Sequence, residues 1–383
     1  MAKRGHSIHL SSLEKPQRST QEIEAVREQC ERAGIDWHPL RFRSDLPFVG
    51  VVENYRQLRR SAVALNAERP LDLIHARSYI PGLVAAWMKR RFGTPFLFDM
   101  RGFWPDERVD GGLWPQSNPV FRTVYRYFKR READLLRNAD AIISLTEAGR
   151  NILLDRPDRS PDGPPITLIP CCADLEAFPP VTDRDRESAR RNLGIATDRT
   201  VVAYLGSTGT WYLLGEMLDF FRSQLELEPT ALFLIVSRDD PRPILAAARA
   251  HGIPDEALLI RPAARAEVPK FLAAADYGLF FIKPCFSKKA SSPTKLGEFL
   301  ALGLPVVTNS GVGDVDHVIS ESGAGVLVDA FTPDAYRKAI RAIHALPRDP
   351  ETWRAKAKRW FDLSAGVKKY AEVYREIGAE PND

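Results

Sequence analysis

The segment SSPTKLGEFLALGLPVV, residues 291–307, carries the clearest local structure signals in the chain. Ser292 followed by Pro293 is typical of the N-cap and first turn of a helix. Gly303 predicts the end of that helix, and Pro305 opens a short apolar run typical of a buried strand. The segment therefore predicts a helix followed at once by a strand, which is the repeating step of an α/β sheet.

The same alternation continues on both sides of this segment. Short apolar runs bounded by turn residues alternate with amphipathic stretches, as in βα units around a parallel sheet. Strands are expected at 7–11, 37–42, 71–76, 95–99, 139–144, 200–205, 231–237, 258–261, 277–282, 305–309 and 325–328. Helices are expected at 21–33, 54–67, 80–92, 120–137 and 213–221. The predicted fold class is α/β, with two doubly wound Rossmann-like domains.

The domain boundary is expected within residues 164–180, where five prolines interrupt any helix. We therefore predict a first domain at 1–172, a second at 173–346, and two amphipathic helices at 347–383 that pack across the domains. The opening residues resemble the last turn of a helix, because Lys3 and Arg4 precede Gly5. A doubly wound domain begins with a strand and a glycine-rich turn, so the first strand-helix unit is expected to be missing. Partners on both sides of strand 7–11 would contradict this.

Composition limits the class of protein. The 383 residues are 44% hydrophobic and 27% charged, which is typical of a soluble globular protein and excludes disordered and fibrous classes. No apolar run approaches the roughly 18 to 20 residues needed to cross a bilayer. Four cysteines without CxxC spacing indicate a reducing cytoplasm, without a disulfide framework or a structural zinc site. Residues 1–172 hold 27 Lys and Arg against 21 Asp and Glu, so anionic partners suit the first half.

The predicted helix after Pro293 offers an anion site. Its free N–H groups, with Ser292, Thr294 and Lys295 beside them, suit a diphosphate without a metal ion. Glu298 lies one turn after Thr294 and could accept hydrogen bonds from a ribose diol. The alternative is that Lys295 is a solvated helix residue and Glu298 only its neighbour.

Residues 293–307 resemble the donor-binding helix of GT-B-fold nucleotide-sugar glycosyltransferases, in particular the retaining family four. The shared string is Pro-Thr-Lys-x-x-Glu-(Phe/Tyr)-x-Ala-x-Gly-x-Pro-Val-Val, and it implies that Glu298 holds the nucleotide ribose. The glycine turn at Gly206 and Ser207 resembles the first loop of the family's nucleotide domain, where small residues let backbone approach a phosphate. A plain tight turn is the alternative there.

Two departures from the family's pattern stand in this donor region. Ala290 occupies the position of a second glutamate that often lies near the sugar. Trp211 and Tyr212 stand where the family commonly places Arg and Lys. Lys295 is therefore expected to supply more of the charge that neutralises the diphosphate.

The segment at 98–108 resembles an Asp-x-Arg-(Gly/Asp)-x-Trp-Pro string that the family places at its cleft. Asp99 could orient the acceptor hydroxyl or accept its proton, and Arg101 could meet donor or acceptor oxygens. A buried Asp99–Arg101 ion pair that shapes the loop is the alternative. His75 is more ordinary, because a lone histidine usually has a structural role. Residues 311–314 form a second candidate donor-side loop.

The resemblance implies a cytoplasmic glycosyltransferase that moves a sugar from a nucleotide diphosphate sugar to an acceptor hydroxyl, with retention. No cofactor, metal ion or nucleic acid is expected. The acceptor could be a glycan, a lipid-linked molecule or a small metabolite. Two alternatives stay open: a nucleotide-sugar epimerase of the same architecture, and a non-catalytic donor-binding subunit.

The predicted helix at 120–137 carries an apolar stripe of Phe121, Val124, Tyr125 and Phe128 beside several basic residues. Such a helix can lie on an anionic membrane, which would place the protein at the inner face of the plasma membrane. It can equally turn its apolar stripe toward the core and leave a solvated basic face. The sequence does not separate these two arrangements.

Overall fold

The computed structural model describes residues 1–43 and 49–381. They form two compact units. Unit 1 comprises 1–145, 149–169 and 367–383, and unit 2 comprises 146–148 and 170–366. The chain thus passes from unit 1 to unit 2 at Pro170, within the range 164–180 expected for the boundary, and returns to unit 1 at Val367. The predicted tail is divided between the units: α14 (Pro350–Phe361) belongs to unit 2, while most of α15 (Leu363–Glu376) belongs to unit 1.

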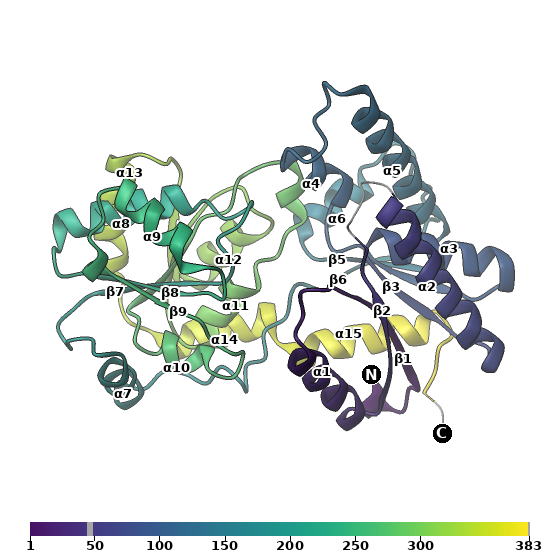
Figure 1. The fold of residues 1–383 in the computed structure, drawn as a ribbon, viewed down its shortest axis with the longest axis horizontal. Helices are drawn as coiled ribbons and strands as arrows, with labels where there is room; N and C mark the ends of the chain where they lie inside the picture. The colour runs from purple at the N-terminus through teal and green to yellow at the C-terminus, as the bar shows by residue number, and fades with distance from the viewer. Residues whose placement is uncertain (44–48, 382–383) are drawn as a thin grey trace. The chain divides into compact units, whose positions relative to one another are not determined.

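Unit 2 is built on a six-stranded parallel sheet with the order β12-β11-β10-β7-β8-β9. Its strands are β7 (Val201–Leu205), β8 (Leu232–Val236), β9 (Leu258–Arg261), β10 (Tyr277–Phe280), β11 (Val306–Asn309) and β12 (Gly325–Val328). Its helices before α14 are α7 (Asp183–Leu193), α8 (Leu214–Leu227), α9 (Pro241–Ala250), α10 (Val268–Leu272), α11 (Thr294–Ala301), α12 (Val315–Ser322) and α13 (Pro333–His344). Figure 1 shows α8, α9 and α13 on one face of this sheet and α11 and α14 on the other.

The strand order of unit 2 reverses between β7 and β10, which lie side by side in the sheet. Ligands of doubly wound sheets bind beyond the carboxyl ends of the strands at such a reversal. Strands β7 and β8 are fully buried, apolar runs, as expected where helices cover both faces, whereas the edge strands β9 and β12 are partly exposed. Helix α11 approaches the core closely because Gly297 has no side chain; a Cβ there would lie 2.8 Å from the Phe361 ring.

Unit 1 contains a four-stranded parallel sheet, β3-β4-β5-β6, and a two-stranded parallel sheet, β1-β2. The strands are β1 (Ile8–Glu14), β2 (Ile35–Arg41), β3 (Ile74–Arg77), β4 (Phe96–Asp99), β5 (Ala141–Ser144) and β6 (Ile166–Leu168). The helices are α1 (Thr20–Arg32), α2 (Val49–Glu68), α3 (Tyr79–Phe92), α4 (Trp104–Asp110), α5 (Pro119–Asn138) and α6 (Glu147–Leu154). Within the described residues β1 pairs only with β2, so it is not a central strand with partners on both sides.

Helix α5 turns its apolar stripe inward. Phe128 is buried and stacks on Trp114, and the Tyr125 hydroxyl donates to Asp106 at 2.8 Å. Arg122, Arg126 and Arg130 remain exposed on the outer face. This is the arrangement of an amphipathic helix that packs on a core. Among the described residues, no helix is long and apolar enough to span a membrane.

Candidate active site

Lys295, in the first turn of α11, is almost completely buried. Its ammonium nitrogen lies 3.5 Å from the centre of the Tyr212 ring and 4.2 Å from that of Tyr204, and it donates to the Tyr204 hydroxyl at 3.1 Å. Burial lowers the pKa of Lys295 well below its ordinary value, and nearby Glu298 only partly opposes this. The alternative of a solvated lysine is therefore wrong, because aromatic rings take the place of water around this charge.

A second buried lysine lies beside Trp211. The nitrogen of Lys288 is 3.8 Å from the centre of the Trp211 ring, and the residue is only 6% exposed. It belongs to a 3-10 turn, Phe286–Ala290, that follows β10. Sequence reasoning missed Lys288, although it stands three residues before the segment that was singled out. Each of the two aromatic residues at 211 and 212 thus carries a buried ammonium group on its ring.

The glycine turn after β7 lies directly against Lys295. A Cβ at Gly206 would lie 3.3 Å from the lysine nitrogen, and its φ of 114° suits glycine alone. The Ser207 hydroxyl and the Thr208 backbone N–H both donate to Asp239, at 3.0 and 2.6 Å. Although burial acts to raise it, these hydrogen bonds hold the pKa of Asp239 below its ordinary value. Ser207 therefore shapes the turn through Asp239 as this structure stands.

Glu298 is buried one turn after Lys295, and its Oε1 accepts a hydrogen bond from Arg265. The guanidinium of Arg265 also lies 4.6 Å from the centre of the Phe178 ring, while its side chain is 58% exposed. Arg265 was not predicted. The available signal was its place just past the carboxyl end of β9, where ligand-binding residues of parallel sheets gather. A carboxylate held in this way can accept hydrogen bonds from a diol.

The start of α11 differs from the prediction in one respect. Pro293 is the N-cap and no side chain caps the helix, whereas the Ser292 hydroxyl accepts a hydrogen bond from the Cys171 N–H at 3.2 Å. Ser292 is therefore not the cap, because its hydroxyl oxygen accepts a hydrogen bond from Cys171, which is distant in sequence. Thr294 is the first helical residue, and no side-chain cap is formed at the start of α11 in the described part of the chain. The predicted helix end is confirmed, since Gly303 follows α11 with a φ of 71°.

The role predicted for the loop at 311–314, that of a second donor-side loop, stays a prediction. The Asp314 carboxylate accepts hydrogen bonds from the backbone N–H groups of Glu147 and Ala148, at 2.7 and 3.1 Å. Gly313 leaves no room for a side chain, because a Cβ would lie 2.2 Å from the Ser291 carbonyl oxygen. In this structure the loop contacts the backbone of two other segments, at residues 147–148 and at Ser291.

Asp99 in unit 1 ends strand β4 and is only 3% exposed. Its Oδ2 accepts from the Tyr370 hydroxyl at 3.1 Å and lies 3.5 Å from Nε2 of His75. Nδ1 of His75 lies 2.8 Å from the Tyr374 hydroxyl, and burial, with Asp99 nearby, raises the pKa of Tyr374 to about 12. Tyr370 and His75 therefore contact one oxygen of this carboxylate, and Tyr374 positions His75. The other oxygen, Oδ1, is buried and has no hydrogen-bond partner among the described residues.

The Asp99–Arg101 pair is loose. The closest distance, from Nη1 of Arg101 to Oδ1 of Asp99, is 4.0 Å. Arg101 has a φ of 61°, which is unusual for a residue with a Cβ, and such strained positions gather at functional sites. The alternative of a buried Asp99–Arg101 ion pair that shapes the loop therefore stays open.

Comparison with known proteins bears on both units. Residues 1–172 match the family model described as "Glycosyl transferase 4-like domain", and residues 185–360 match "Glycosyl transferases group 1". The chain belongs to the GT-B glycosyltransferases of the family-four type. The predicted fold class is confirmed as well, with two Rossmann-like units and parallel sheets.

Curated relatives of this glycosyltransferase are distant. It is 25% identical to a D-inositol 3-phosphate glycosyltransferase of Segniliparus rotundus over 72% of this chain and 59% of the relative. The chain thus spans less than two thirds of that relative's length. Among solved structures, sucrose-phosphate synthase from Thermosynechococcus elongatus superposes with a TM-score of 0.74 at 19% identity, covering 97% of this chain and 99% of the other. HepE from Anabaena, solved with UDP and glucose, gives 0.69 at 14%, covering 97% and 100%.

Proposed function

We propose that this glycosyltransferase moves a sugar from a nucleotide diphosphate sugar to an acceptor hydroxyl, with retention and without a metal ion. The observation that carries the proposal is Lys295. Its ammonium group is buried at the uncapped start of α11 and directly under the glycine turn at Gly206. A buried cation beside free backbone N–H groups attracts a diphosphate strongly, because little water screens it.

The two lysines on the aromatic pair would stabilise the departing diphosphate. Lys295 lies against Tyr212 and Lys288 against Trp211. Trp211 and Tyr212 thus occupy the positions where the family commonly carries Arg and Lys. Lys288 and Lys295, which lie against these two rings, would supply the positive charge instead. Charge that develops on the leaving group during transfer is stabilised by such fixed cations and helix N–H groups. Glu298 would hold the ribose.

Asp99 would act on the acceptor. Oδ1 is buried without a hydrogen-bond partner among the described residues, so an acceptor hydroxyl that reached it would supply the missing hydrogen bond. The carboxylate would orient that hydroxyl or accept its proton, while Tyr370 keeps Oδ2 in place. Arg101 would contact donor or acceptor oxygens. The acceptor is a glycan, a lipid-linked molecule or a small metabolite.

The exposed basic face of α5 supports a peripheral association with anionic lipid, as each basic residue near such a surface contributes about 1 kcal/mol. The small number of cysteines, four in 383 residues and without CxxC spacing, suits the reducing cytoplasm. Vesicles containing an anionic lipid should bind the wild-type chain and release it at high salt. A chain with Arg122, Arg126 and Arg130 changed to Gln should no longer bind them.

The central test begins with UDP and GDP in a thermal-shift assay, followed by the corresponding nucleotide sugars with a panel of acceptors that includes inositol phosphates. Transfer should occur equally in EDTA. Epimer formation without an acceptor would overturn the transferase assignment. Nucleotide binding with no turnover on any acceptor would instead support a donor-binding subunit. Lys288→Met should weaken binding of the nucleotide, whereas Lys289→Met, at the exposed neighbour, should not.

A further inference from the structure

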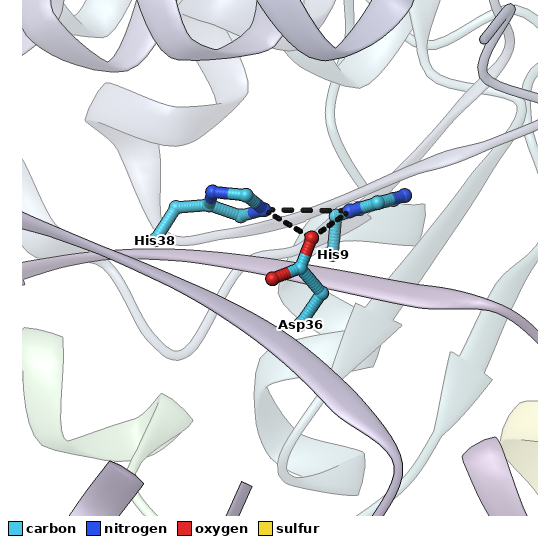
Figure 2. A group of neighbouring side chains, drawn as sticks. All are labelled: His9, Asp36 and His38. Atoms are coloured by element: carbon cyan, nitrogen blue, oxygen red, sulfur yellow. Dashed lines mark hydrogen bonds and ion pairs between the residues drawn. The ribbon is translucent and has the colours of Figure 1, made fainter. Parts of the chain in front are cut away.

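Two histidines and one aspartate converge on the first two strands of unit 1 (Figure 2). Nδ1 of His9 and Nε2 of His38 each lie 2.9 Å from Oδ2 of Asp36, and the two nitrogens are 3.3 Å apart. Three potential ligand atoms thus form a small, nearly equilateral triangle. None of the roles assigned above to unit 1 uses these residues.

The strand register brings the three side chains together. His9 on β1 is directly opposite Asp36 on β2, and His38 follows two residues later on the same face of β2. Ser11, which lies opposite His38, bonds through its hydroxyl to Ser61 of α2 at 2.9 Å. The cluster therefore lies on the α2 side of the sheet, near the amino ends of both strands. Asp99, by contrast, stands at a carboxyl end.

The spacing suits a tetrahedral metal ion. Ligand atoms about 2.0 to 2.1 Å from zinc lie about 3.3 Å from one another in a tetrahedral site. The three distances in the triangle are within a few tenths of an ångström of that value. An ion a short way above the triangle would therefore reach all three atoms with little side-chain movement, and one coordination position would remain open to solvent.

We propose that His9, Asp36 and His38 bind one divalent transition-metal ion, with zinc as the ion this donor set favours. Two imidazole nitrogens and a carboxylate oxygen suit zinc better than magnesium or calcium, which prefer oxygen alone. Bound there, the ion joins residues 9 and 36–38 and so closes the first βαβ segment. A two-stranded sheet is marginal by itself, so the link would chiefly stabilise the β1-β2 pair.

The site is separate from the proposed transfer chemistry. Its residues lie near the amino ends of β1 and β2. The side chain of His9 is 29% exposed, that of Asp36 58% and that of His38 31%. Metal can therefore enter from solvent without any opening of the unit. Removal of the ion should leave sugar transfer unchanged, so failure of this proposal and failure of the proposed function give different results.

The test is a titration of the metal-free full chain with Zn²⁺ in competition with a chromophoric chelator. One ion per chain should bind with a Kd in the micromolar range or tighter, and Zn²⁺ should raise the melting temperature. His38→Ala and Asp36→Asn should each weaken binding by about tenfold or more and abolish the thermal shift. Circular dichroism and melting without metal should match the wild type, which shows that the variants fold.

His251→Ala is the matched control. Nδ1 of His251 also lies 2.9 Å from an aspartate, Asp219, but no second histidine completes that pair in the described structure. This variant should bind Zn²⁺ like the wild type. No saturable binding below about 100 µM, or binding that His38→Ala leaves unchanged, would overturn the proposal.

Discussion

The residues around Lys295 in unit 2 and those around Asp99 in unit 1 surround a buried charged side chain in opposite ways. Lys295 is surrounded by aromatic rings and donates a hydrogen bond to the uncharged Tyr204 hydroxyl, so its charge is left to attract an anion. Asp99 has one oxygen held by a tyrosine 271 residues later and the other without a hydrogen bond among the described residues. The first arrangement suits the attraction of a large anion. The second suits the orientation of a single hydroxyl.

The largest effect is expected from Lys295→Met, which removes the buried charge and keeps much of the volume. Because fixed cations stabilise the leaving diphosphate, kcat/KM should fall by about 10³-fold, and UDP or GDP should bind far more weakly. Steady-state kinetics and calorimetry measure the two. Lys289→Met, on the exposed neighbouring lysine, is the control. If Lys295→Met bound UDP or GDP with wild-type affinity, Lys295 would not be the charge that attracts the diphosphate.

Asp99→Asn should reduce turnover by about 10²-fold, because an amide cannot accept the acceptor's proton. Nucleotide affinity should stay near the wild-type value, since the change is in unit 1. Both are measured together with the melting temperature. Asp72→Asn, at an exposed aspartate of the same unit, controls for loss of charge. Equal losses of turnover and affinity, with a lower melting temperature, would assign Asp99 a purely structural role.

Glu298→Ala should weaken nucleotide binding by about 1 to 3 kcal/mol, the range for a hydrogen bond to a charged group. The variant should fold, and the effect should be largest for ligands that carry a ribose. Titration with UDP and with pyrophosphate separates the ribose contact from the diphosphate contact. Glu351→Ala, at an exposed glutamate of α14, is the matched control. Equal weakening of UDP and pyrophosphate would place Glu298 on the diphosphate instead.

The smallest expected effect is a pH dependence. Burial lowers the pKa of Lys295 in the free protein, and a bound diphosphate raises it again by favouring the charged form. Binding should therefore take up protons, and affinity should fall as pH rises through the lowered pKa, by at most about tenfold per pH unit. Calorimetry in buffers of different ionisation enthalpy measures the uptake. Lys295→Met should show no proton uptake on nucleotide binding. An equal proton uptake in that variant would mean that another group takes up the proton.

Local patterns predicted most of the fold because each strand is a short apolar run and each helix is amphipathic. The helix after Pro293 ends before Gly303 as expected. Lys295 and Glu298, both predicted to bind the donor, are buried on it, and their roles stay predictions. The predicted cap at Ser292 was wrong, because in the folded chain the Ser292 hydroxyl accepts a hydrogen bond from the backbone N–H of Cys171. Such a contact joins positions far apart in sequence, and no local signal reports it.

The sequence by itself determined the alternation of strands and helices, the family, and which residues follow the carboxyl ends of the strands. These depend on interactions within a few residues, where periodicity and turn chemistry act. Only the tertiary structure decided that Lys288 meets Trp211, that Arg265 holds Glu298, and that His9 lies beside His38. Those contacts depend on strand register and on packing of distant segments, and burial then sets how strongly each charge acts.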